Sequence, residues 1–183
     1  MTTADRIPLL VLGLGNVLCE DDGAGVAALH QLHREWDLPD GVLALDGGTL
    51  GLALLPLVER AEIVVLVDAI RGDGPPGTRL RIEGADVAPA VYERLSPHQI
   101  GVADLLGGAA LLGRYPATVV LLGVVPASTD LGLGCTPDVA AAIPGLVDDV
   151  VAELAALGRP ATRASVTTGP PRRVDDAALA LGL

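Results

Sequence analysis

The chain has 183 residues, of which 50% are hydrophobic and 19% are charged, and this composition excludes a disordered protein. Its 12 Lys and Arg residues are outnumbered by 23 Asp and Glu residues, which gives a net charge of -11, and only 2% of the residues are aromatic. Such a charge repels phosphate backbones and anionic membrane surfaces, and so few aromatic side chains offer little base stacking. We therefore expect neither a nucleic acid nor a membrane as a partner.

The cysteine content and the apolar runs indicate where the protein works. Cys19 and Cys135 are too few for a disulfide scaffold and lack the paired spacing of a structural zinc site. No apolar run reaches the length of about 18 residues that spans a bilayer. The first residues also lack the basic and then apolar pattern of a secretion signal. These features predict a cytoplasmic protein.

Apolar runs alternate with helical patterns along the chain. In chain order we expect a strand at 7–12, a helix at 25–36, a strand at 42–45, a short helix at 50–59, strands at 62–67 and 78–82 on either side of a loop at 71–77, a helix at 100–112, a strand at 117–123 and a helix at 137–158. Thr136 is the expected N-cap of the last helix, and Pro144 is expected to interrupt that helix.

This alternation predicts an α/β fold, a three-layer α/β/α sandwich with a mostly parallel twisted central sheet. The length is that of one domain, which we place at residues 1–158. Residues 159–183 differ in composition, with paired prolines and arginines and scattered Ser and Thr, and we expect them to form a disordered tail.

A glycine-rich segment at 13–25 connects the first strand to the first helix. Glycines at this place suggest a dinucleotide-binding loop, but the spacing is wrong and Glu20, Asp21 and Asp22 would face the pyrophosphate. Acidic residues at the start of a helix also complement the helix dipole without any further role. Both a functional and a purely structural interpretation of these carboxylates remain open.

Asp68 and His98 are further candidates for a site. Asp68 follows the strand at 62–67 directly, and catalytic groups of open α/β sheets lie at such carboxyl ends, although Asp there also initiates turns. His98 precedes a helix, where it serves either as a ligand or as a capping and packing residue. If the strands are parallel, Asp22, Asp68 and His98 lie at one edge of the sheet. Mixed nitrogen and oxygen ligands with an open position suit nickel or zinc.

Other reactive side chains point less clearly to a site. His30 and His33 are three residues apart and could share a face as a two-histidine metal site, but their polar neighbours favour a solvated helix surface. Cys19 is expected to be a small buried residue and Cys135 a loop thiol, since neither has a neighbouring His or Lys that would mark a nucleophile. The chain contains neither a Gly-x-Ser-x-Gly elbow nor a His-Glu-x-x-His helix, which excludes two common hydrolase mechanisms.

Four sequence blocks occur in a characteristic order. They are Gly-Leu-Gly-Asn at 13–16 with Asp-Asp-Gly at 21–23, Asp-Gly-Gly-Thr at 46–49, Val-Asp-Ala at 67–69 and Ser-Pro-His-Gln at 96–99. Leu-Gly-Val at 122–124 with Pro126, and Thr-Pro at 136–137, agree as well. Over residues 7–157 the chain thereby resembles the hydrogenase maturation endopeptidases, which process the large subunit of nickel-iron hydrogenases.

The resemblance implies a fold, an activity and a set of site residues. The fold is a phosphorylase/hydrolase-like sheet between helices, and the activity is a single cut that removes a C-terminal extension from the large-subunit precursor after nickel insertion. The metal-binding and catalytic positions fall on Asp22, Asp68 and His98, and some family members have Glu at the Asp22 position. The loop linked to substrate recognition comprises Asp46, Gly47, Gly48 and Thr49.

The resulting hypothesis is a monomeric endopeptidase that uses nickel supplied by its substrate. Nickel would polarise the scissile carbonyl or activate water, or Asp22 or Asp68 would act as a general base, and the sequence does not choose between these routes. One alternative is a nickel-checking chaperone that holds the precursor without cutting it. Another is a nucleotide-binding α/β domain, against which the acidic loop argues.

Overall fold

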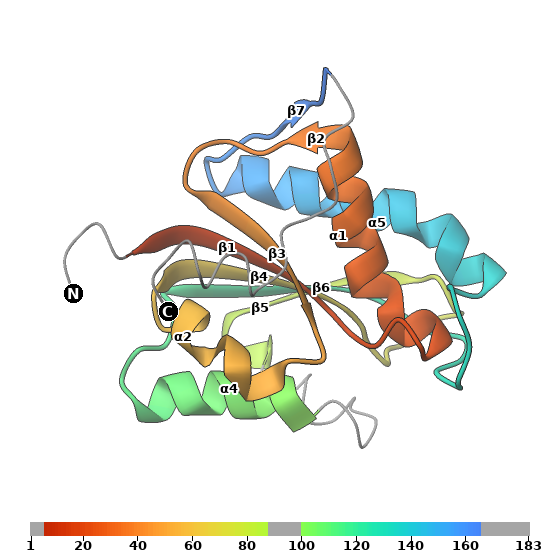
Figure 1. The fold of residues 1–183 in the computed structure, drawn as a ribbon, viewed down its shortest axis with the longest axis horizontal. Helices are drawn as coiled ribbons and strands as arrows, with labels where there is room; N and C mark the ends of the chain where they lie inside the picture. The colour runs from red at the N-terminus through yellow and green to blue at the C-terminus, as the bar shows by residue number, and fades with distance from the viewer. Residues whose placement is uncertain (1–5, 88–99, 166–183) are drawn as a thin grey trace.

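The computed structural model describes residues 6–87 and 100–165. Five strands form one sheet in the order β3-β1-β4-β6-β5 (Figure 1). The strands of this sheet are β1 (Ile7–Leu14), β3 (Val42–Gly48), β4 (Ala61–Ala69), β5 (Arg79–Glu83) and β6 (Thr118–Val124). β1 pairs in parallel with β3 and β4, and β4 pairs in parallel with β6. Only β5, at the edge, is antiparallel to its neighbour within this sheet.

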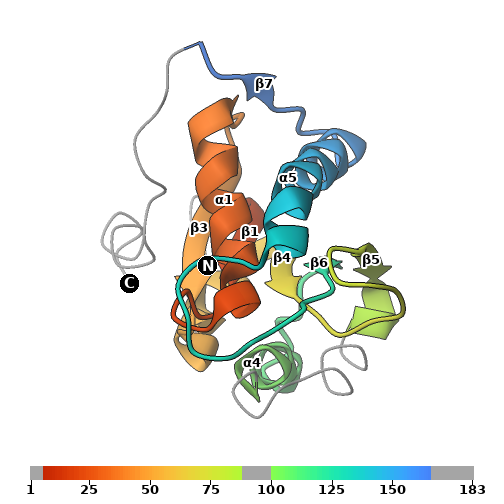
Figure 2. The ribbon, with the colours of Figure 1, turned by 90° about the vertical axis from the view of Figure 1, so that its right-hand side faces the viewer.

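Helices cover both faces of the sheet. α1 (Ala24–Glu35) and α5 (Pro137–Ala156) lie side by side on one face, and α2 (Leu55–Val58) and α4 (Ile100–Leu111) lie on the other (Figures 1 and 2). A 3-10 helix at Gly51–Leu54 precedes α2. The three-layer α/β/α sandwich with a mostly parallel sheet is therefore confirmed. Within the described residues, no helix is long and apolar enough to cross a membrane.

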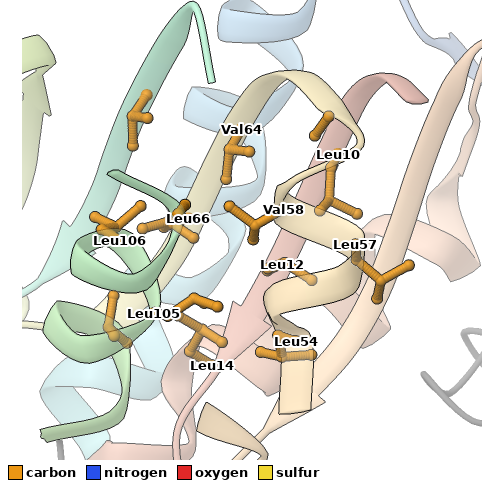
Figure 3. Close-up of a cluster of buried hydrophobic side chains, with 14 of the residues drawn as sticks. Leu10, Leu12, Leu14, Leu54, Leu57, Val58, Val64, Leu66, Leu105 and Leu106 are labelled. Atoms are coloured by element: carbon orange, nitrogen blue, oxygen red, sulfur yellow. The ribbon is translucent and has the colours of Figure 1, made fainter. Parts of the chain in front are cut away.

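Alternate residues of the central strands fill two separate apolar layers. In β1, Leu10 and Leu12 pack toward α2 and α4, whereas Leu9 and Val11 pack toward α1 and α5. Figure 3 shows the first of these layers, in which leucines from β1, β4 and α4 interdigitate. Burial on both faces explains why β1 and β4 are continuously apolar instead of alternating.

Pro144 does not interrupt α5, so the expectation of a break is wrong. The helix runs from Pro137 to Ala156 with the proline inside it. Proline removes one backbone donor, but Ile143, Leu146 and Val147 around it are buried against the sheet. Tertiary packing of this face holds the helix together across the proline, which a local sequence rule does not capture.

The expected tail begins with residues that are part of the fold. β7 (Thr162–Arg163) pairs antiparallel with β2 (Trp36–Asp37) at the end of α1. The Arg163 guanidinium lies 4.4 Å from the centroid of the Trp36 ring and 2.8 Å from a Glu35 carboxylate oxygen. These contacts join residues far apart in the chain, so composition did not reveal them. Residues 166–183 of the expected tail lie outside the described residues.

Glycines bring the start of α1 close to the strand ends. A Cβ at Gly25, in the first turn of α1, would overlap the carbonyl oxygen of Val67 at the end of β4. A Cβ at Gly13, near the end of β1, would lie only 2.7 Å from the carbonyl oxygen of Gly25. The glycines at the end of β1 and in the first turn of α1 therefore allow close packing between helix and sheet.

Replacing Gly25 with alanine is expected to destabilise the fold strongly, because backbone atoms of β4 must move away. We expect a loss of about 1–3 kcal/mol or more in the free energy of unfolding, measured by urea denaturation. Gly108 in α4 is the matched control, since its added Cβ would meet only side-chain atoms of Leu55 and Leu52, the nearest at 3.4 Å. Gly108→Ala is expected to be neutral or to stabilise by about 0.5–1 kcal/mol. Equal effects of the two substitutions would contradict this account of Gly25.

Candidate active site

A cavity of about 680 Å³ opens at the carboxyl ends of β1, β3 and β4. The ends of these strands, the 3-10 helix at Gly51–Leu54, α4 and the loop after β6 form its walls. This edge is where open α/β sheets hold their sites. The lining is mainly apolar, with Asp22 and Asp68 as buried carboxylates, and this combination is typical of a binding or catalytic pocket.

Asp68 lies near the end of β4 and is only 5% exposed. Its Oδ1 accepts a hydrogen bond of 2.8 Å from the backbone N–H of Ala69. Burial, together with the negative charge of Asp22, raises the pKa of Asp68 to about 8. Near neutral pH this carboxyl group is therefore mostly protonated and ionises just above neutral pH, which suits a group that exchanges a proton or meets a cation.

Asp22 reaches the same cavity from a short 3-10 helix, Glu20–Gly23, that follows β1. It is 7% exposed, and its Oδ2 accepts a hydrogen bond of 2.7 Å from the backbone N–H of Asn16. Gly15, directly before Asn16, has a φ of +112°, and a Cβ there would overlap the carbonyl oxygen of Asp22. A glycine is thus required for the chain to fold back and bring Asp22 beside Asp68.

The structure brings together two of the three predicted site residues. Asp22 and Asp68 line one cavity, as expected for a parallel sheet edge. His98 lies outside the described residues. The described chain resumes at α4, whose Val102 and Leu105 line the cavity. Within the described ranges, no group of three His, Cys, Asp or Glu side chains is placed to hold a metal ion.

The loop at 46–49, which the sequence resemblance predicts to recognise substrate, is divided between two environments. Gly48 and Thr49 line the cavity, whereas Asp46 and Gly47 are not part of its lining. The Oδ2 of Asp46 lies 3.2 Å from Nε2 of His30 on α1. This contact, which sequence reasoning missed, turns the Asp46 side chain toward the helix.

The two histidines of α1 contact β3 instead of forming a common metal site with each other. His30 is hydrogen-bonded to Asp46, and Nε2 of His33 lies 3.2 Å from the carbonyl oxygen of Ala44. Of the two thiols, Cys19 lines the cavity while Cys135 does not. Burial and the nearby Asp21 raise the pKa of Cys135, which disfavours the thiolate and agrees with its interpretation as a non-nucleophile.

Asp21 is a second residue whose role sequence reasoning missed. Its side chain is fully buried and accepts hydrogen bonds from Ala127, Ser128 and Thr136 in the loop after β6. Burial acts to raise its pKa, but these backbone hydrogen bonds outweigh burial and hold the pKa below its usual value. The sequence offered one sign of this role, the adjacent pair Asp21 and Asp22. Adjacent side chains in a short helix point in different directions, so the two carboxylates have different partners.

A buried carboxylate pair in a cavity at the carboxyl edge of an α/β sheet defines an enzyme-type site, and comparisons with known proteins identify the family. The sequence model of the HycI hydrogenase maturation protease family matches residues 26–153. The hydrogenase 2 maturation protease of Escherichia coli strain K12 is 37% identical over 147 residues, which cover 80% of this chain and 90% of that protein. HupD, a hydrogenase expression/formation protein of Bradyrhizobium diazoefficiens, is 37% identical over 94% of this chain and 91% of its own.

Solved structures agree with this result. The hydrogenase maturating endopeptidase HybD from E. coli superimposes with a TM-score of 0.82 at 36% identity, over 86% of this chain and 98% of that chain. The [NiFe] hydrogenase maturation protease HybD from Thermococcus kodakarensis has a TM-score of 0.61 at 29% identity, over 78% of this chain and 96% of its own. The chain therefore belongs to the hydrogenase maturation protease family. It is an endopeptidase, and this assignment replaces the nucleotide-binding alternative.

The raised pKa of Asp68 predicts how stability depends on pH. Between about pH 4 and pH 8 the native state holds a proton at Asp68 that the unfolded state has lost, so rising pH destabilises the fold across this range. Asp68→Asn removes this effect. In chelator-treated protein we expect the variant to melt at least about 3 °C above the parent at pH 8, with a smaller difference at pH 4.5.

The matched control is Asp104→Asn, since Asp104 is an exposed carboxylate on α4. Its substitution is expected to leave the melting temperature within about 1 °C of the parent at both pH values. A melting temperature of Asp68→Asn below that of the parent at pH 8 would show that the ionised carboxylate stabilises the fold.

Proposed function

We propose that this endopeptidase removes a C-terminal extension from the precursor of a nickel-iron hydrogenase large subunit, after nickel has been inserted. Membership of the maturation protease family supports the reaction class, and the names of its relatives support hydrogenase as the pathway. At the level of residues, the proposal rests on the two buried carboxylates Asp22 and Asp68, which line the same cavity.

The substrate's nickel is proposed as the recognition element. Two neighbouring carboxylates repel each other, which is why Asp22 contributes to the raised pKa of Asp68, and a divalent cation relieves that repulsion. Two carboxylates and one imidazole form an incomplete set of oxygen and nitrogen ligands, which leaves positions for ligands from the substrate. Asp22, Asp68 and His98 would hold the ion, which would act as a Lewis acid on the scissile carbonyl or on water.

In an alternative route, in which Asp68 does not bind the ion, we propose Asp68 as the proton carrier. A general base works best when its pKa lies near the working pH, and the pKa of Asp68 is raised to about 8. Its Oδ1 is occupied by the Ala69 N–H, which fixes the orientation of the carboxylate in the cavity. We propose that Asp68 accepts the proton of the attacking water, with Asp22 kept in place by the Asn16 N–H.

The shape and chemistry of the cavity fit a polypeptide segment. Leu14, Leu54 and Leu105 give it an apolar wall, and Gly48 and Thr49 add backbone groups at the end of β3. We propose that the loop at 46–49 contacts the substrate chain through Gly48 and Thr49, while Asp46 supports the loop through its contact with His30.

The proposed partner is the precursor protein alone, without nucleic acid or membrane, and the proposed form of the enzyme is a monomer. The net charge of -11 favours a basic surface on the precursor. The cytoplasm is proposed as its compartment, because both cysteines are free thiols and such thiols are typical of reducing compartments.

Substitutions at the three site residues test this proposal. Asp22→Asn, Asp68→Asn and His98→Ala are each expected to slow cleavage of nickel-loaded precursor at least about 100-fold, because each removes a ligand or a proton acceptor. Mass spectrometry of the large subunit measures the loss of the extension. Asp104→Asn is the control and is expected to cleave like the parent, since Asp104 is exposed and does not line the cavity.

Full cleavage by both Asp68→Asn and His98→Ala would overturn the assignment of the site. A parent protein that forms a stable complex with the precursor, without any loss of mass, would instead favour the nickel-checking chaperone. Nothing in the comparisons supports that alternative.

A further inference from the structure

One wall of the cavity is a loop that has little regular structure of its own. Residues 125–136, which we call the β6–α5 loop, connect the end of β6 to the start of α5. Thr129, Asp130 and Leu131 of this loop line the cavity. Val125 at the start of the loop is buried, but the side chains of Leu131 and Leu133 are 87% and 83% exposed, so apolar packing does not hold the middle of the loop in place. A long connection of this kind needs another anchor if it is to present a defined surface.

Asp21 provides that anchor through its two carboxylate oxygens. Oδ2 accepts hydrogen bonds from the backbone N–H groups of Ala127 and Ser128, at 2.8 and 3.1 Å, and from the Thr136 hydroxyl at 2.8 Å. Oδ1 accepts a hydrogen bond of 2.6 Å from the backbone N–H of Thr136. One buried side chain thus holds both ends of the β6–α5 loop, about 110 residues further along the chain.

Backbone hydrogen bonds extend this attachment to the middle of the loop. The N–H of Asp21 donates to the carbonyl oxygen of Ser128 at 3.2 Å, and the N–H of Glu20 donates to that of Gly132 at 3.1 Å. The N–H of Gly132 donates to the carbonyl oxygen of Leu18 at 2.9 Å. Figure 2 shows the loop running past the segment that leads into α1. The segment that carries Asp22 is therefore also attached to the neighbouring cavity wall, which the β6–α5 loop forms.

Adjacent carboxylates in one short helix therefore have different partners. Asp22 lines the cavity, whereas Asp21 is fully buried against the β6–α5 loop. A movement of the loop relative to Asp21 would change the distance between the cavity wall and Asp22. Because charge-assisted hydrogen bonds in a buried place are strong and directional, this attachment fixes that distance.

We propose that Asp21 is a positioning residue, which holds the β6–α5 loop against the segment of Asp22 and thereby sets the affinity of the site for its polypeptide substrate. The nature of that substrate rests on the proposed function. Asp21 does not touch the reacting atoms, so its removal is expected to weaken substrate binding more than the chemical step.

An amide cannot replace this carboxylate. Four donors surround the two oxygens of Asp21. Asn has one oxygen and one NH₂ group, so in either orientation an N–H group would face another donor. We therefore expect Asp21→Asn to release at least one end of the loop while leaving the size of the side chain unchanged.

The test measures kcat and KM for nickel-loaded precursor, together with amide hydrogen exchange. For Asp21→Asn we expect KM to rise at least about fivefold with kcat within about threefold of the parent. The amides of Ala127, Ser128 and Thr136 are expected to lose protection. Glu153→Gln is the matched control, because Glu153 is also a buried carboxylate, bonded to Arg81 at 2.6 and 3.0 Å, and does not line the cavity. Its KM and the protection of the three amides are expected to match those of the parent.

A second pair of variants covers the case in which Asp21→Asn does not fold. Thr136→Ser keeps the hydroxyl that donates to Asp21, and Thr136→Val removes it. We expect a raised KM for the valine variant and a parental KM for the serine variant. A parental KM for both Asp21→Asn and Thr136→Val, or an equal rise in Glu153→Gln, overturns the role of Asp21.

Failure of the proposed function gives a different result. In that case the parent itself does not shorten the precursor. The same variants are then compared by the dissociation constant of the precursor complex. An unchanged constant for Asp21→Asn or for Thr136→Val, or no binding by the parent, counts against the positioning role.

Discussion

Two carboxylates of like charge share one buried cavity, and the rest of the site depends on how the fold holds them there. Asp68 is fixed by the N–H of its own neighbour and Asp22 by the N–H of Asn16. Ionising both carboxylates is unfavourable, because burial and the charge of Asp22 raise the pKa of Asp68 to about 8. Such a pair is stable when it holds a proton or contacts a cation, which fits the proposed recognition of nickel in the substrate.

The geometry of the pair comes from backbone features around β1 and β4. The parallel pairing of these strands brings their carboxyl ends to one edge, and Gly25 lets α1 begin directly above that edge. Gly15 reverses the chain so that Asp22 returns to the end of β4. Asp21 then attaches the β6–α5 loop to the same segment, so the cavity wall and the carboxylate pair form one connected unit.

Elements that short-range sequence patterns determine, such as the buried strands, could be predicted from the sequence. The buried strands were recognisable as apolar runs, and Asp68 could be placed at the sheet edge because it directly follows the apolar run at 63–67, although β4 itself continues to Ala69. Asp22 was a candidate from its place at the sheet edge, but the family blocks were needed to favour it, since an acidic residue before a helix has an ordinary explanation in the helix dipole. Pro144 inside α5, the pairing of β7 with β2, the contact of Asp46 with His30 and the role of Asp21 all depend on residues distant in the chain. No local pattern encodes such contacts, and His98 stays a prediction from the resemblance.

The most direct measurement is the titration of Asp68 by ¹³C NMR in metal-free protein with labelled aspartate carboxyl groups. The account predicts that Asp68 titrates near pH 8, and that Asp22→Asn moves this titration to lower pH because the neighbouring charge is gone. Titration of Asp68 near pH 4 in the parent, or a titration that does not respond to Asp22→Asn, would contradict a coupled carboxylate pair and with it the proposed site.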